Sequence, residues 1–123
     1  MRLKDDFFRI LNVNADATEY SIRLNSEHSI YHDHFPENPI TPGVCIIQIV
    51  KELVADNLAC PIFLQKIAKV RYFKAINPVE TPEINVSLTV SEQSGKYNVS
   101  ATVFVNETVF TQLSMCFAPT GEG

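Results

Sequence analysis

Residues 43–58 read GVCIIQIVKELVADNL, and no proline or further glycine interrupts the stretch. Apolar side chains recur at positions 44, 46, 47, 50, 53, 54 and 58, the spacing of an α-helix face. The first half is apolar nearly all round, so this helix is expected to be largely buried. Thr41 as N-cap and Pro42 at the first helical position predict where it begins.

The sequence on either side of this helix favours strands. Residues 18–24 alternate between apolar and polar side chains, which is typical of a half-buried strand. Further strands are predicted over residues 62–76, 83–92, 96–105 and 107–117. Residues 3–12 predict a short helix with one apolar side, and residues 25–42 predict an irregular loop because they hold several prolines and histidines.

One buried helix followed by antiparallel strands predicts an α+β fold in which a sheet wraps the helix. With 123 residues and 46% hydrophobic content, the chain is expected to form one domain over residues 1–123. A curled sheet leaves edge strands exposed, and pairing two sheets across a twofold axis would cover them. We therefore expect a homodimer or a higher even-numbered oligomer.

Charge and hydropathy exclude two classes of partner at this stage. The formal net charge of -4 argues against a general nucleic-acid binder. The charged N-terminus lacks the apolar run of a signal peptide, and no stretch approaches the roughly 20 apolar residues of a membrane span. These features predict a cytoplasmic protein that binds neither nucleic acid nor membrane.

The cysteines are expected to be reduced thiols in the core. Cys45, Cys60 and Cys116 are odd in number, widely separated and set among apolar residues. A nucleophilic Cys45 is the alternative, although no activating base stands beside it in the sequence.

Chemistry is concentrated in residues 34–44, HFPENPITPGV. The prolines stiffen the segment and give His34 a defined position. The amides of Gly43 and Val44 would lie in the first helical turn without intrahelical acceptors, where they can stabilise a carbonyl oxygen that gains charge. A histidine base beside such donors suits removal of a proton next to a carbonyl. The alternative is a stiff connection with a packed histidine and an ordinarily capped helix.

The string HFPENPITPGVCII resembles the HFPxxPxxPGV signature of the 3-hydroxyacyl-[acyl carrier protein] dehydratases of fatty acid synthesis. Residues 67–78, IAKVRYFKAINP, are similar to the strand that follows the long helix in that family. The resemblance implies the hotdog fold, an antiparallel sheet wrapped around one long buried helix. It also implies a substrate joined as a thioester to acyl carrier protein or coenzyme A, and no cofactor.

The resemblance assigns roles to individual residues. His34 would remove the C2 proton of a 3-hydroxyacyl thioester, and the Gly43 amide would bind the thioester oxygen. The family carries a carboxylate five residues after that glycine, contributed by the other subunit, where this chain has Gln48. An amide cannot supply a proton at neutral pH. Glu52 stands one turn further on and would reach the same pocket; a solvated charge beside Lys51 is the alternative.

Other residues have weaker assignments. Tyr31, Phe35, Pro42 and Val44 are expected to bind substrate, with packing of the loop as the alternative for the two aromatic side chains. A basic cluster is expected to dock a carrier protein: Lys66, Lys69, Arg71 and Lys74. Strand alternation places Lys69 and Arg71 on one face and Lys66 and Lys74 on the other, so solvation of some of them is the alternative.

Metal binding is not expected at the histidines. His28, His32 and His34 follow no recognised zinc spacing, and no cysteine pair accompanies them. Three function classes stay open: a dehydratase or hydratase, a hotdog thioesterase in which Glu52 activates water, and an acyl-thioester binding subunit without activity.

Overall fold

The computed structural model describes residues 2–33 and 37–120. Their helices and strands are, in chain order, β1 (Phe8–Val13), β2 (Glu19–Leu24), α1 (Ser29–Asp33), α2 (Gly43–Leu58), β3 (Ile62–Tyr72), β4 (Glu83–Gln93), β5 (Lys96–Val105) and β6 (Thr108–Pro119). None of the helices in these described ranges is both long and apolar enough to cross a membrane.

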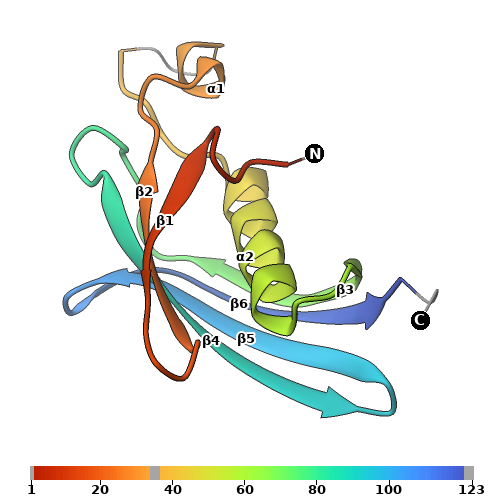
Figure 1. Ribbon diagram of the computed structural model, residues 1–123. Coiled ribbons are helices and arrows are strands. Elements are labelled where there is room, and N and C mark those ends of the chain that lie inside the picture. The colour runs from red at the N-terminus through yellow and green to blue at the C-terminus, as the bar shows by residue number, and fades with distance from the viewer. Residues whose placement is uncertain (1, 34–36, 121–123) are drawn as a thin grey trace.

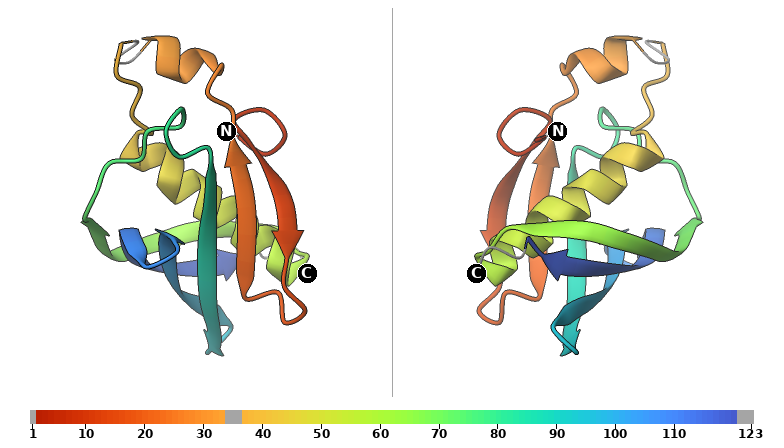
Figure 2. Two further views of the ribbon diagram at one scale, coloured as in Figure 1. Left: turned by 90° about the vertical axis from the view of Figure 1, so that its left-hand side faces the viewer. Right: turned by 90° about the vertical axis from the view of Figure 1, so that its right-hand side faces the viewer.

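The strands form one curled antiparallel sheet with the order β1-β2-β4-β5-β6-β3. Helix α2 lies along the concave face of this sheet, and the strands curve around it (Figures 1 and 2). The α+β prediction of a sheet wrapped around one long helix is therefore confirmed. Strands β1 and β3 are the two edges.

Helix α2 is held by one apolar face. Ile49, Val50, Leu53 and Val54 are almost completely buried and pack against the inward residues of the strands. The helix ends at Leu58 because Ala59 adopts the left-handed conformation, which stops helical hydrogen bonding. The predicted extent of this helix, residues 43 to about 58, is confirmed.

The predicted helix over residues 3–12 is wrong. Residues 8–13 form β1, which pairs with β2 from Phe8 opposite Leu24 to Val13 opposite Tyr20. Before the strand, the amides of Phe7 and Phe8 bond to the carbonyl of Leu3 and close a single turn. The backbone pairing offered by β2 outweighs the weak helical periodicity of so short a segment.

Three other expectations need correction. Pro42, in an extended conformation, is the N-cap of α2, whereas Thr41 is buried and its hydroxyl lies 2.8 Å from that of Tyr31. Residues 25–42 are not wholly irregular, because α1 forms within them. The strand predicted to reach residue 76 ends at Tyr72, after which the amides of Phe73 and Lys74 both bond to the carbonyl of Phe110 and the regular ladder stops.

The cysteines are free thiols, as expected, but only Cys45 is buried; Cys60 and Cys116 are half-buried. Burial raises the pKa of the Cys45 thiol, which disfavours the thiolate that a nucleophile requires.

Candidate active site

The site predicted at residues 34–44 is described only in part. His34 and Phe35 lie outside the described residues, so their contacts are not part of the geometry below. The described part comprises residues 37–44, the first turns of α2 and the end of β3.

The first turn of α2 presents backbone donors that have no acceptor in the described part of the chain. The amides of Cys45 and Ile46 bond to the carbonyl of Pro42, at 3.0 and 3.2 Å. The preceding amides, those of Gly43 and Val44, have no acceptor among residues 2–33 and 37–120. Val44 itself is 68% exposed. This end of the helix can therefore donate hydrogen bonds to an oxygen that approaches from outside.

Gly43 is packed against a side chain from β3. A Cβ atom at position 43 would lie 2.5 Å from the Tyr72 hydroxyl oxygen and 2.8 Å from Cζ of the same ring. A larger residue at position 43 would have to displace the exposed phenol of Tyr72, a contact that the sequence pattern does not predict. The only signal was an aromatic residue in the segment IAKVRYFKAINP.

Gly43 and Tyr72 belong to an open groove of about 310 Å³. Its other lining residues are mostly apolar: Ile40, Thr41, Ile46, Phe73, Lys74, Ala75 and Ile76. Ile46 and Ile76 are almost fully buried and form its floor. An apolar group attached to an oxygen at Gly43 would find a matching surface here.

Gln48 and Glu52 lie together on α2, and Glu52 holds the N-terminal segment. The Glu52 carboxylate accepts hydrogen bonds from the amides of Leu3 (2.7 Å) and Lys4 (2.8 Å). Gln48 Nε2 donates to the same carboxylate at 2.8 Å. Glu52 is therefore not a solvated charge beside Lys51, since it ties the buried Leu3 and its neighbour to the helix.

Tyr31 belongs to the core. It is 2% exposed, its ring stacks on Phe7 with centroids 5.1 Å apart, and its hydroxyl hydrogen-bonds with Thr41. Burial raises its pKa to about 12. Of the two readings for Tyr31, packing of the loop is the one that these contacts support. Pro42 is half-buried where the loop enters α2.

The basic side chains of β3 are arranged differently from the prediction. The strand has irregularities between Leu64 and Lys66 and between Ile67 and Lys69. As a result Lys66, Lys69 and Arg71 pair with Cys116, Ser114 and Gln112, which alternate along β6 and share one face. The predicted separation of Lys66 from Lys69 and Arg71 is therefore wrong. Lys74 lies beyond the strand, with Nζ 5.7 Å from the centroid of the Phe110 ring.

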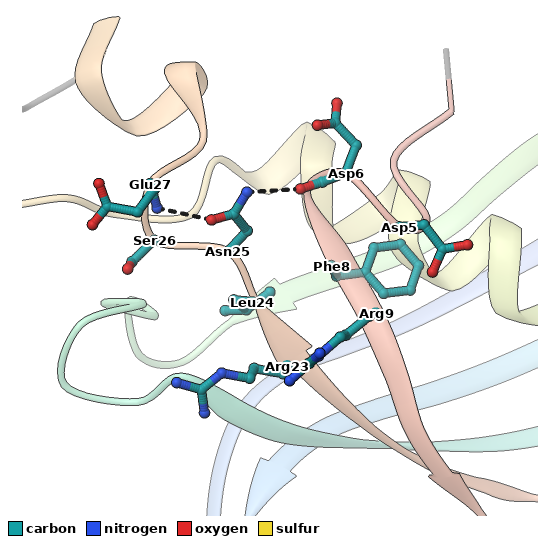
Figure 3. A pocket seen from close by; sticks show the side chains of 9 residues that line it. All are labelled: Asp5, Asp6, Phe8, Arg9, Arg23, Leu24, Asn25, Ser26 and Glu27. Atoms are coloured by element: carbon teal, nitrogen blue, oxygen red, sulfur yellow. Dashed lines mark hydrogen bonds between the residues drawn. The ribbon is translucent and has the colours of Figure 1, made fainter.

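A second groove, of about 400 Å³, lies beside the β1–β2 hairpin and holds none of the predicted site residues (Figure 3). Arg9 and Arg23 stand opposite each other on its two strands, and Arg23 pairs with Glu83 at 3.0 Å. The groove also contains three carboxylates, and Asn25 bonds to the carbonyl of Asp6 at 2.9 Å.

The described histidines have ordinary contacts. His28 Nε2 lies 3.1 Å from an Asp6 carboxylate oxygen. Within residues 2–33 and 37–120, no cluster of three metal-ligating side chains is found.

A curled antiparallel sheet around one long helix, entered through a proline-rich segment, defines a hotdog-fold protein. The chain belongs to the ApeI-like family, whose family model, described as ApeI dehydratase, matches residues 11–111. Its sequence is 26% identical over 116 residues to the 3-hydroxyacyl-[acyl-carrier-protein] dehydratase FabZ of Syntrophobacter fumaroxidans, covering 87% of this chain and 78% of that protein.

Two solved structures show the same fold. A chain of the dehydratase heterocomplex ApeI:P from Xenorhabdus doucetiae matches with a TM-score of 0.68 at 18% identity, covering 89% of this chain and 96% of that chain. A hypothetical thioesterase from Streptococcus pneumoniae, crystallised with coenzyme A, matches with a TM-score of 0.62 at 10% identity, covering 98% of this chain and 94% of that chain.

Proposed function

We propose that this chain is a 3-hydroxyacyl-thioester dehydratase with its site at His34 and Gly43. The observation that carries the proposal is the pair of amides at Gly43 and Val44, which have no acceptor among the described residues and directly follow the segment HFPENPITP in a chain of a dehydratase family. The FabZ relative is named for the same reaction on acyl carrier protein thioesters.

In the proposed reaction, His34 takes a proton from C2 of the acyl chain. The electron pair of that C–H bond delocalises onto the thioester oxygen, which the Gly43 amide stabilises. The C3–O bond then breaks, and the hydroxyl leaves as water once it has received a proton. Gln48 orients this hydroxyl but cannot protonate it. The nearest carboxylate on the helix is Glu52, which is linked to Gln48 by a hydrogen bond.

The test uses purified protein with 3-hydroxyacyl and trans-2-enoyl thioesters of several chain lengths, and follows the enoyl absorbance. Wild type is expected to interconvert the two thioesters. His34→Ala is expected to abolish the conversion while keeping the far-ultraviolet circular dichroism spectrum and the unfolding midpoint. A His34→Ala variant with wild-type turnover would show that the base has been misassigned.

A binding subunit without activity is the second candidate. Gln48 stands where the resemblance expects a carboxylate, and the Glu52 carboxylate already holds the N-terminal segment. Such a subunit would bind acyl thioesters saturably and form no enoyl product by itself, and adding an active relative would restore turnover. Release of free thiol from the same substrates would instead identify a thioesterase.

We also propose that the chain forms a homodimer through the edge strand β3. Phe63 and Ile67 on this strand are 44% and 43% exposed, and pairing of two β3 strands would cover this unpaired edge and its apolar side chains. Sedimentation at micromolar concentration is expected to give a dimer, and Ile67→Asp a monomer. A wild-type monomer would contradict this proposal.

The partner proposed for the basic side chains is the acidic surface of an acyl carrier protein. Lys66, Lys69 and Arg71 share one face, and no carboxylate of the described residues lies within ion-pair distance of them. Charge reversal at Lys69 is expected to raise KM for carrier-linked substrates more than for coenzyme A thioesters. The cytoplasmic location stays a prediction.

A further inference from the structure

Tyr72 is the last residue of β3, and its phenol reaches the start of α2. The ring fills the space that a Cβ atom of residue 43 would occupy, with the hydroxyl oxygen closer to that point than the ring carbon Cζ. The hydroxyl is therefore the part of Tyr72 that faces Gly43. At 52% exposure, the side chain also borders the open groove, so a ligand that enters the groove meets the same hydroxyl.

Hydrogen-bond donors gather at this point without acceptors. The amides of Gly43 and Val44 have none, and neither does the Tyr72 hydroxyl, among residues 2–33 and 37–120. Because Gly43 and Tyr72 line the same groove, one acceptor oxygen of a ligand can take hydrogen bonds from both.

We propose that the Tyr72 hydroxyl donates a hydrogen bond to the thioester oxygen of the bound acyl group, beside the Gly43 amide. This inference rests on the proposed function and adds a substrate-contacting residue to the same site. Loss of the C2 proton turns the thioester carbonyl into an enolate oxygen, and a second donor stabilises that charge. The phenol O–H bond stays intact throughout, so no proton is exchanged with Tyr72.

Two properties of the site fit this role. Burial raises the pKa of Tyr72, so the phenol keeps its proton and remains a donor at neutral pH. The groove floor of Ile46 and Ile76 is apolar, and a hydrogen bond to a developing charge is stronger in such surroundings than in water.

The test is Tyr72→Phe, which removes the hydroxyl and keeps the ring against Gly43. We expect kcat for dehydration to fall by about 10²- to 10³-fold with little change in KM, the order seen when one donor to an oxyanion is removed. Tyr97→Phe is the matched control, because Tyr97 lies on β5 outside the groove; its kcat is expected to equal that of wild type.

A second readout works without turnover. A trans-2-decenoyl thioester of N-acetylcysteamine, labelled with ¹³C at the carbonyl, is bound to wild type and to Tyr72→Phe. Polarisation by the hydroxyl shifts the carbonyl resonance in wild type, and the shift is expected to shrink in Tyr72→Phe but not in Tyr97→Phe. Equal shifts and equal rates in wild type and Tyr72→Phe overturn this inference and leave the dehydratase proposal standing. If wild type neither binds nor converts any acyl thioester, both fall.

Discussion

Replacing Glu52 by glutamine tests what the carboxylate does in this protein. Its two oxygens accept hydrogen bonds from the amides of Leu3 and Lys4 and from Gln48 Nε2. A glutamine amide has one acceptor oxygen, so it can serve one of the two backbone amides and presents its own N–H groups to the other. At least one hydrogen bond to a charged acceptor is therefore lost, and a partly buried donor is left without a partner.

The expected cost follows from that geometry. A hydrogen bond to a charged group contributes about 1.5–3 kcal/mol, so Glu52→Gln is expected to lower the free energy of unfolding by about 2 kcal/mol. For a chain of this size the fall in Tm is roughly 6–10 °C. The assay is urea and thermal unfolding followed by circular dichroism. Glu107→Gln is the control, because Glu107 is exposed in the β5–β6 turn and is expected to leave the midpoint unchanged.

Stability and turnover together separate the two roles of Glu52. If the Glu52 carboxylate holds the N-terminal segment, Glu52→Gln loses stability. Any loss of activity at temperatures where the variant stays folded then reports a second, chemical role of Glu52. A Glu52→Gln protein with the unfolding midpoint of wild type would show that the carboxylate does not stabilise the N-terminal segment. If that protein had also lost its turnover, Glu52 would be the acid that the resemblance places on this helix.

Three further predictions concern the same region. Thr41→Val removes the only described hydrogen-bond partner of the buried Tyr31 hydroxyl and is expected to lower the free energy of unfolding in urea by about 1–3 kcal/mol. Thr111→Val removes a hydroxyl with no partner in the described chain and is expected to leave that free energy unchanged or raise it. Gly43→Ala is expected to displace the exposed Tyr72 phenol, seen as shifted ring resonances, and to change the free energy of unfolding by less than about 1 kcal/mol. Burial raises the pKa of Tyr31 from 10.0 to about 12, so the protonated phenol contributes fully to stability below pH 10 and that contribution is lost as the pH rises through 12. In a plot of the unfolding midpoint against pH, Tyr31→Phe is expected to reduce the fall between pH 10 and 12.

The sequence predicts elements whose burial pattern is regular. Helix α2 buries one face from Cys45 to Val54 with regular helical spacing, so its apolar pattern predicts a helix here correctly. Strands β4 and β5 alternate cleanly and match their predicted ranges within one residue. The helix prediction for residues 3–12 is wrong because Phe7 and Phe8 are both buried, a pattern that neither a helix nor a strand period explains.

Contacts between distant residues set most of the candidate site, and local pattern cannot report them. The phenol of Tyr72 meets Gly43 only because β3 ends beside the start of α2. The acceptors for the amides of Leu3 and Lys4 come from Glu52, far along the chain. The shared face of Lys66 and Lys69 depends on irregularities in β3 that strict alternation hides.

Exchanging the residues at positions 48 and 52 asks whether the site lacks only its acid. In Gln48→Glu alone, the new carboxylate would stand beside the Glu52 carboxylate, where Gln48 Nε2 now lies 2.8 Å from Oε2. Two carboxylates this close repel and share a proton, so the single substitution changes the charge of both groups and cannot be interpreted simply. The double substitution Gln48→Glu with Glu52→Gln keeps one carboxylate and one amide, and the amide at position 52 can donate to the carboxylate at position 48.

We expect the double variant to be less stable than wild type by about the cost of Glu52→Gln alone, since both lose the same acceptor for the N-terminal amides. Its rate of enoyl formation is expected to exceed that of Glu52→Gln by about tenfold or more, because general acid catalysis is worth roughly 10²- to 10⁴-fold when geometry allows it. Glu52→Gln is the matched control, as it differs from the double variant only at position 48. Equal rates in the two proteins would show that position 48 does not face the reacting hydroxyl, and that the resemblance fails on this face of α2.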